Sequence, residues 1–304
     1  MALQIKRGKI QRAKKIVIYG PEGIGKTTFA AAFPDPVFID TEGGSDHMDV
    51  ARIDGIYTWD DLCMACSEVA QEKPCKTLVI DTADWAEQML IDKLLMKYKK
   101  QSLSDFGYGS GHVMLAEEFS DLIAILDSVI ASGINVVVTA HAAMRKFEQP
   151  DEQGAYDRWE MKLTRKVAPL LKEWADCLFF LNYETYVIHG DAMEKNKVGG
   201  GERVMYTSHN PVWDAKNRFG LPEKLPIDYK AIENIMEQKS LLEMTEDVIA
   251  AADLTPSDVM KVAIARGKAE EGQTLEDMND RVLTWINKYI DNIKILINKE
   301  NENG

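Results

Sequence analysis

The feature that most constrains this chain is the segment from Gly20 to Thr27, which reads Gly-Pro-Glu-Gly-Ile-Gly-Lys-Thr. It matches the pattern G-x-x-x-x-G-K-[ST] at every fixed position. An apolar segment, Lys15–Tyr19, precedes it, and a helical pattern, Gly25–Ala32, follows it. Because a strand before and a helix after are what such a loop requires, the sequence predicts a P-loop that binds the phosphates of a nucleoside triphosphate.

The residue types of this segment suit a phosphate site. Glycines let backbone N–H groups curl around an anion, and a helix N-terminus adds partial positive charge. We expect Lys26 to reach the β- and γ-phosphates and the Thr27 hydroxyl to bind Mg²⁺. A dinucleotide site is disfavoured because the third glycine of G-x-G-x-x-G is missing. The predicted ATP-binding residues are Gly20, Pro21, Glu22, Gly23, Ile24, Gly25, Lys26, Thr27 and Thr28.

Two apolar segments end in carboxylates. Thr77–Asp81 predicts a buried strand whose Asp81 completes the magnesium site, although Asp81 is also placed to cap the next helix. Thr82 follows, where many ATPases have Glu, so the residue that activates water must lie elsewhere. Pro36–Asp40 runs into Glu42, which we expect to act as general base or to orient the attacking water. The alternative is that Glu42 is a solvated loop charge.

A histidine follows a further apolar segment. Asn135–Ala140 predicts a strand, and His141 comes directly after it. At that position a polar side chain lies near the γ-phosphate and can respond to hydrolysis. A purely structural histidine remains the alternative.

Apolar and helical segments alternate through the first two thirds of the chain, which indicates an α/β fold with a mostly parallel sheet buried on both faces. A β-hairpin, Thr185–His189 with Arg203–Ser208, predicts antiparallel edge strands around the loop Gly190–Glu202. We expect a core of residues 1–228 and a helical C-terminal subdomain of residues 229–304. The other predicted strand is Cys177–Leu181, and the predicted helices are Trp59–Ala70, Trp85–Tyr98, His112–Ala131, Met161–Trp174, Tyr229–Glu237, Leu241–Ala251, Pro256–Arg266 and Leu275–Ile297.

Composition limits the choice of function. A net charge of −13 argues against a generally basic nucleic-acid coat protein, although it leaves room for a local basic loop. The chain has neither a membrane-length apolar run nor a signal peptide, so we expect a cytoplasmic protein without a membrane partner. Cys63 and Cys66 form a C-x-x-C without a second ligand pair, and their spacing favours one buried helix face over a metal or redox site.

The segment Arg145–Glu160 predicts a loop in which basic and aromatic residues are interleaved. Single-stranded nucleic acid is bound by such segments, with cations along the backbone and aromatic rings under bases. The same segment carries acidic residues, so an ordinary surface loop is the alternative. The predicted DNA-binding residues are Arg145, Lys146, Phe147, Tyr156, Arg158 and Trp159.

The order of these parts resembles the RecA-like ATPase core. Over roughly residues 13–225 the chain is more closely similar to phage-encoded RecA-like proteins of the Sak single-strand-annealing type. The stretches that carry this resemblance begin at Tyr19 (Tyr-Gly-Pro-Glu-Gly-Ile-Gly-Lys-Thr-Thr), Phe38 (Phe-Ile-Asp-Thr-Glu-Gly-Gly), Tyr108 (Tyr-Gly-Ser-Gly-His-Val), Glu173 (Glu-Trp-Ala-Asp-Cys) and Trp213 (Trp-Asp-Ala-Lys-Asn-Arg-Phe-Gly-Leu-Pro).

This resemblance implies specific roles. Glu42 falls on the catalytic glutamate, and His141 on a sensor that is normally Gln. Self-association as a ring or filament is implied, with Lys216 or Arg218 as a cation donated to the neighbour's site. The expected function is ATP hydrolysis with Mg²⁺, coupled to single-stranded DNA in phage recombination or annealing, with a single-strand-binding protein as a further partner. The alternatives are a nucleotide-gated scaffold or helicase loader and a nucleotide kinase, which lacks support because no Arg-dense lid is present.

Overall fold

The computed structural model describes residues 12–148, 154–188, 197–236 and 241–303. The chain divides into two compact units, one of residues 12–236 and one that contains residues 237–304. The first unit extends to Met236, past the expected boundary at residue 228, because Ile232, Ile235 and Met236 pack into its core.

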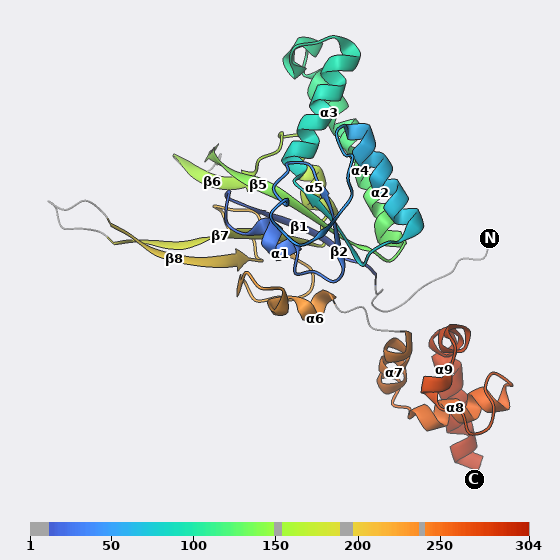
Figure 1. Ribbon diagram of the computed structural model, residues 1–304. Helices are drawn as coiled ribbons and strands as arrows, with labels where there is room; N and C mark the ends of the chain where they lie inside the picture. The colour runs from blue at the N-terminus through green and yellow to red at the C-terminus, as the bar shows by residue number, and fades with distance from the viewer. Residues whose placement is uncertain (1–11, 149–153, 189–196, 237–240, 304) are drawn as a thin grey trace. The chain divides into compact units, whose positions relative to one another are not determined.

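The first unit is built on one ten-stranded sheet (Figure 1). Its central strands run parallel, in the order β7-β1-β5-β4-β2-β3, and β8 and β10 continue the sheet antiparallel at one edge. The predicted class, an α/β core with antiparallel edge strands, is confirmed. The strands are β1 (Lys15–Gly20), β2 (Pro36–Asp40), β3 (Ala51–Arg52), β4 (Thr77–Asp81), β5 (Asn135–Glu148), β6 (Ala155–Met161), β7 (Cys177–Ile188), β8 (Lys197–Tyr206), β9 (Lys216–Asn217) and β10 (Lys224–Pro226).

Helices cover both faces of the sheet, as the apolar strands require. In β1, Val17 and Tyr19 belong to the core on one face, and Ile16 and Ile18 to the core on the other. This alternation follows from the two-residue period of a strand. The first face is covered by α2 (Trp59–Glu72), α3 (Ala83–Tyr98), α4 (Ser110–Ala131) and α5 (Ala168–Trp174), and the second by α1 (Lys26–Ala30) and α6 (Glu233–Met236), as Figure 1 shows.

The C-x-x-C pair lies on α2. Both thiols are free, Cys66 is fully buried, and burial raises the pKa of Cys63 to about 11. Burial also raises the pKa of the Cys66 thiol. These thiols are therefore packing groups at neutral pH, because the thiolate is the form that reacts or binds metal.

The predicted loop Arg145–Glu160 was wrong in its secondary structure. β5 continues to Glu148, and β6 pairs with it antiparallel, with Arg145 opposite Arg158 and Phe147 opposite Tyr156. Its polar composition suggested a loop, but cross-strand pairing is compatible with polar residues in a hairpin that water reaches. Residues 149–153 at its tip lie outside the described residues.

The predicted helix Met161–Trp174 was wrong in its first half. Met161 ends β6, and α5 begins only at Ala168, with Pro169 in its first turn. Proline is favoured there and disfavoured farther inside a helix, which fixes the start of α5.

The second predicted hairpin is confirmed and is longer than expected. β7 and β8 pair from Phe180 opposite Tyr206 to Ile188 opposite Lys197. The predicted loop Gly190–Glu202 falls partly on β8 and partly on residues 189–196, which lie outside the described residues.

The second unit is helical, as predicted. Its helices are α7 (Leu241–Ala251), α8 (Pro256–Ala265) and α9 (Asp280–Asn303), which bury Ile249, Val259 and Ile286 among other apolar residues. Thr255 caps α8 by accepting a hydrogen bond from the Asp258 N–H. Among the helices that the structure describes, none combines the length and apolar character needed to span a bilayer.

Candidate nucleotide site

The P-loop begins where β1 ends. Gly20 packs so closely on β7 that a Cβ atom would lie 2.4 Å from the Leu181 carbonyl oxygen, so only glycine fits there. Gly23 and Gly25 have φ values of 71° and 106°, which glycine adopts without strain. The sequence therefore folds into a tight loop because its glycines stand at the positions that other side chains cannot occupy.

Lys26 lies folded over this loop. Its Nζ atom donates to the carbonyl oxygens of Gly20 and Pro21 at 3.2 and 3.1 Å. Burial lowers the pKa of the Lys26 ammonium, and neighbouring carboxylates, with Asp81 foremost, oppose this shift. The ammonium is thus held at the P-loop by weak neutral acceptors, which an anionic phosphate would outcompete.

Asp81 and Thr27 meet as predicted for a magnesium site. The Thr27 hydroxyl donates to Asp81 Oδ2 at 2.8 Å, and the Thr139 hydroxyl donates to Asp81 Oδ1. Asp81 is only 3% exposed. A hydroxyl and a carboxylate are the hard oxygen donors that Mg²⁺ prefers, so these residues fit the ion.

Glu42 and His141 face each other across the site. Glu42 Oε2 lies 3.9 Å from His141 Nε2. Burial raises the pKa of the Glu42 carboxyl, His141 opposes this, and the nearby Asp81 carboxylate adds to it. A carboxylate with a raised pKa is a stronger base than an ordinary glutamate, as proton removal from water requires.

Asp84 fixes the orientation of His141 and was not found from the sequence. Asp84 Oδ2 lies 2.9 Å from His141 Nδ1, and Asp84 Oδ1 accepts the His141 backbone N–H, also at 2.9 Å. Burial works to raise the pKa of Asp84, but these hydrogen bonds from His141 outweigh it and lower the pKa overall. The ionised Asp84 carboxylate therefore accepts a hydrogen bond from His141 Nδ1–H, and the other ring nitrogen, Nε2, points toward Glu42.

These groups line one hollow of about 380 Å³. It brings together the P-loop, the magnesium-site carboxylate, Glu42 and His141, which the chain carries on four different segments. Its lining residues are Glu22, Gly23, Gly25, Lys26, Thr27, Thr28, Glu42, Gly44, Met48, Asp81, Thr82 and His141.

A smaller hollow of about 190 Å³ also adjoins the P-loop. Gly25 and Thr28 line both hollows. Arg203 reaches the P-loop from β8, with Nη1 3.4 Å from the Ile24 carbonyl oxygen, and Asp228 and Tyr229 complete the wall. Pattern matching missed these three residues because they lie about 175 to 205 positions from the P-loop and belong to no motif.

Lys216 and Arg218 do not line either of these hollows. Lys216 Nζ donates to the carbonyl oxygens of Lys172, Glu173 and Ala175 at the end of α5. Arg218 Nη1 lies 3.2 Å from Asp176, and its side chain is 53% exposed. Within one chain both residues support the structure around α5, and a role in a neighbour's site stays a prediction.

The six predicted DNA-binding residues are divided between the two faces of the β5–β6 hairpin. Arg145, Phe147, Tyr156 and Arg158 share one face, because they pair across the two strands. Lys146 and Trp159 belong to the opposite face. Trp159 is partly buried against Phe180, with ring centroids 6.0 Å apart.

A second carboxylate on α3 connects this hairpin to the nucleotide site. Glu87, one turn after Asp84, accepts hydrogen bonds from the Thr164 N–H at 3.1 Å and from its hydroxyl at 2.7 Å. Lys162 N–H donates to the His141 carbonyl oxygen at 2.7 Å. The three-residue spacing of Asp84 and Glu87 is the sequence signal that would have identified this face of α3.

Comparison with known proteins places these parts in context. A family model described as an AAA domain matches residues 12–219. No curated protein sequence matches the chain. Similar solved structures include a KaiC-like protein from the hyperthermophilic archaeon Pyrococcus horikoshii, with 16% identity, a TM-score of 0.36 and coverage of 64% of this chain and 78% of that one. They also include the flagellar accessory protein FlaH from Methanocaldococcus jannaschii, with 14% identity, a TM-score of 0.34 and coverage of 66% and 87%.

The environment of Glu87 predicts a pH dependence of stability. Burial raises the pKa of the Glu87 carboxyl despite its hydrogen bonds with Thr164. Above the ordinary glutamate value of about 4.3, the folded state therefore binds more protons than the unfolded state. The free energy of unfolding then falls as pH rises from that value through the raised folded-state pKa.

Glu87→Gln removes this ionisation and keeps an oxygen that accepts from Thr164. We expect its free energy of unfolding, measured by urea titration over a pH series, to fall less with rising pH than that of the unaltered chain. Glu87→Ala should lose about 1–3 kcal/mol because the Thr164 donors lose their acceptor. The exposed Glu117→Gln is the matched control on α4. Identical pH slopes for the unaltered chain, Glu87→Gln and Glu117→Gln would show that Glu87 has no such role.

Proposed function

Because this chain belongs to the AAA domain family, we propose that it binds ATP with Mg²⁺ at the P-loop and hydrolyses it. The observation that carries this proposal is the convergence of Lys26, Asp81 and Glu42 on one hollow. On binding, the triphosphate draws Lys26 Nζ away from the carbonyl oxygens of the P-loop. Thr27 and Asp81 would hold the magnesium ion, which would supply positive charge to offset that of the phosphates.

Hydrolysis itself needs a base and a positioned water. In the proposed reaction a water oxygen attacks the γ-phosphorus, Glu42 accepts the proton, and the bond from the γ-phosphorus to the β–γ bridging oxygen breaks to release ADP and phosphate. Asp84 holds His141 so that its Nε2 lies 3.9 Å from Glu42 Oε2, where it would donate to the γ-phosphate. The nucleoside part extends into the smaller hollow, against Arg203 and Tyr229.

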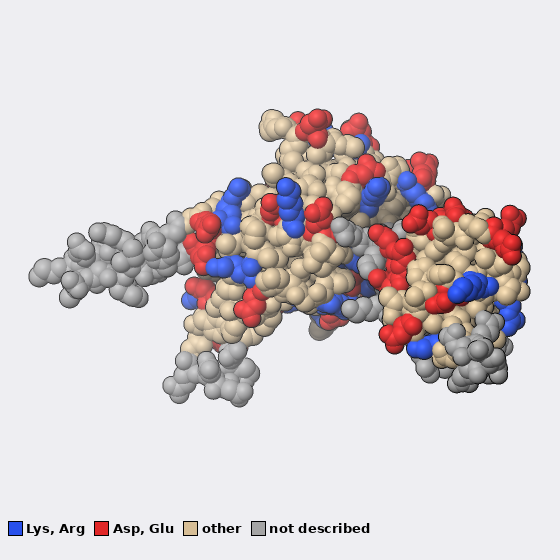
Figure 2. All heavy atoms as spheres, turned by 90° about the horizontal axis from the view of Figure 1, so that it is seen from below, with Lys and Arg blue, Asp and Glu red and all other residues tan. Residues whose placement is uncertain are grey.

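We further propose that the β5–β6 hairpin contacts single-stranded DNA, in recombination or annealing. The hairpin presents Arg145 and Arg158 with Phe147 and Tyr156 on one face, a combination suited to a backbone and its bases. The resemblance to phage-encoded annealing proteins supports the same partner, and it supports self-association as a ring or filament in which Arg218 is offered to a neighbour. Figure 2 shows basic side chains dispersed among acidic ones on the face it draws. This distribution favours DNA contact at a local site over DNA contact across a broad basic surface.

The role of Glu42 gives a direct test of the ATPase proposal. Glu42→Gln keeps the size of the side chain and removes the base, so we expect ATP binding to persist and turnover to fall roughly 10²- to 10⁴-fold. Turnover of the unaltered chain should also fall as the pH drops through the raised pKa of Glu42, since only the carboxylate accepts a proton.

Phosphate release and the affinity for a fluorescent ATP analogue are the measurements. Asp46→Asn, an exposed carboxylate on the same loop, is the matched control and should retain turnover. Unchanged turnover in Glu42→Gln would contradict the proposal. If Glu42→Gln left the protein's biological function intact while Lys26→Ala abolished it, a nucleotide-gated scaffold or loader would be the better account.

The DNA proposal predicts nucleotide-enhanced binding to single strands. Fluorescence anisotropy of a labelled oligo-dT at low salt should show binding that strengthens with a non-hydrolysable ATP analogue and weakens with added salt. Lys26→Ala should lose the enhancement by nucleotide. Absence of binding at low salt with the analogue present would refute a DNA partner.

A further inference from the structure

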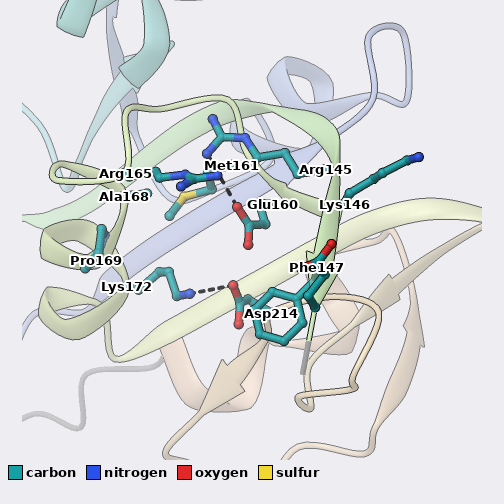
Figure 3. Close-up of a pocket in the computed structure, with 11 residues that line it drawn as sticks. Arg145, Lys146, Phe147, Glu160, Met161, Arg165, Ala168, Pro169, Lys172 and Asp214 are labelled. Carbon is teal, nitrogen blue, oxygen red and sulfur yellow. Dashed lines mark hydrogen bonds and ion pairs between the residues drawn. The ribbon is translucent and has the colours of Figure 1, made fainter. Parts of the chain in front are cut away.

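A second large hollow lies between the β5–β6 hairpin and the segment that leads into α5 (Figure 3). Its volume is about 570 Å³, within the range of roughly 300–1,000 Å³ typical of ligand-binding clefts. We call it the hairpin hollow. It is lined by Arg145, Lys146, Phe147, Glu148, Glu160, Met161, Arg165, Ala168, Pro169, Lys172 and Asp214.

Three cationic side chains converge on the hairpin hollow. Figure 3 shows Arg145 entering from β5 and Arg165 and Lys172 from the α5 side, while Lys146 points away. Arg145 is fixed by a hydrogen bond of 2.7 Å to the Leu163 carbonyl oxygen, in the turn that Glu87 holds through Thr164. Lys172 lies on α5, whose last carbonyl groups are capped by Lys216.

Two of the three acidic residues that line this hollow, Asp214 and Glu160, form ion pairs, and the third, Glu148, is exposed near the end of β5. Asp214 accepts from both Arg158 and Lys172 at 2.5 Å, and its side chain is 11% exposed. Glu160 lies 3.5 Å from Arg145. Arg165 is exposed and has no ion-pair partner among the described residues. Because four basic and three acidic residues line the hollow, it carries a net positive charge, and Arg165 is a cation outside the ion pairs described above.

Apolar groups complete the wall. Phe147, Met161 and Pro169 line the same hollow, and the Arg158 guanidinium lies over the Phe147 ring at 5.2 Å from its centroid. This contact holds the Phe147 ring in a fixed orientation, which suits stacking against a nucleic-acid base. Cationic side chains beside an aromatic ring match the two halves of a nucleotide, the phosphate and the base.

We propose that the hairpin hollow holds one nucleotide of single-stranded DNA, with its phosphate at Arg165 and Lys172 and its base against Phe147. This inference rests on the proposed DNA partner and adds α5 and the turn before it to the hairpin as part of the binding site. Asp214 is a positioning residue here, because it orients Arg158 and Lys172 and contacts no DNA itself.

The test measures oligo-dT affinity of the full chain against salt concentration. Each phosphate contact on a single strand contributes a slope of about 0.7 to the dependence of log Kd on log salt. Arg165→Ala should raise Kd about tenfold at low salt and reduce the slope by about 0.7. Arg165→Lys should restore the slope, because it restores the charge. Lys166→Ala is the matched control, since Lys166 is exposed next to Arg165 but does not line the hollow.

The outcomes separate this inference from the function on which it rests. If the unaltered chain binds DNA and Arg165→Ala has the same affinity and slope, the hairpin hollow is not the site and the DNA partner still stands. If Lys166→Ala loses as much as Arg165→Ala, the effect is general charge and the inference is overturned. If the unaltered chain does not bind DNA at low salt, the DNA function fails and the inference fails with it. Thermal unfolding of each variant checks that a loss of binding is not a loss of fold.

Discussion

The parallel pairing of β1 with β5 is the interaction on which both proposed sites depend. Its register sets Gly20, the first residue of the P-loop, opposite His141. The pairing of β4 with β2 sets Asp40 opposite Asp81 in the same way. Because carboxyl ends of parallel strands meet at one edge of a sheet, residues from four segments reach the proposed triphosphate site without a dedicated binding domain.

The same strand β5 leaves the nucleotide site as one arm of the hairpin. His141 ends its buried part, and Arg145 lies four residues farther along. Two carboxylates one turn apart on α3 bind both ends of this region, Asp84 at His141 and Glu87 at Thr164. Helix α3 thus joins His141, through Asp84, to the turn that fixes Arg145, through Glu87 and Thr164. These contacts form a physical connection between the two regions.

Sequence patterns predicted the centre of the fold better than its periphery. The P-loop, Asp81, Glu42 and His141 follow apolar strands directly, and strand ends can be located from the sequence itself. The sequence predicts a loop for the hairpin because polar residues lie on both of its faces, and its pairing depends on a partner strand rather than on an apolar pattern. Asp214 and Arg203 belong to sites assembled from segments far apart in the chain, so no local spacing marks them. The resemblance implies a role for Lys216 in a neighbour's site, which stays a prediction, and within one chain its three contacts are with carbonyl oxygens at the end of α5.

We propose that DNA binding at the hairpin stimulates ATP hydrolysis at the P-loop. Phosphate release by the unaltered chain, measured with MgATP while oligo-dT is added, tests it most directly. The account predicts release that requires Mg²⁺, rises as the oligonucleotide is added, and saturates over the concentrations at which the oligonucleotide binds. A rate that stays the same with and without saturating oligonucleotide would contradict it.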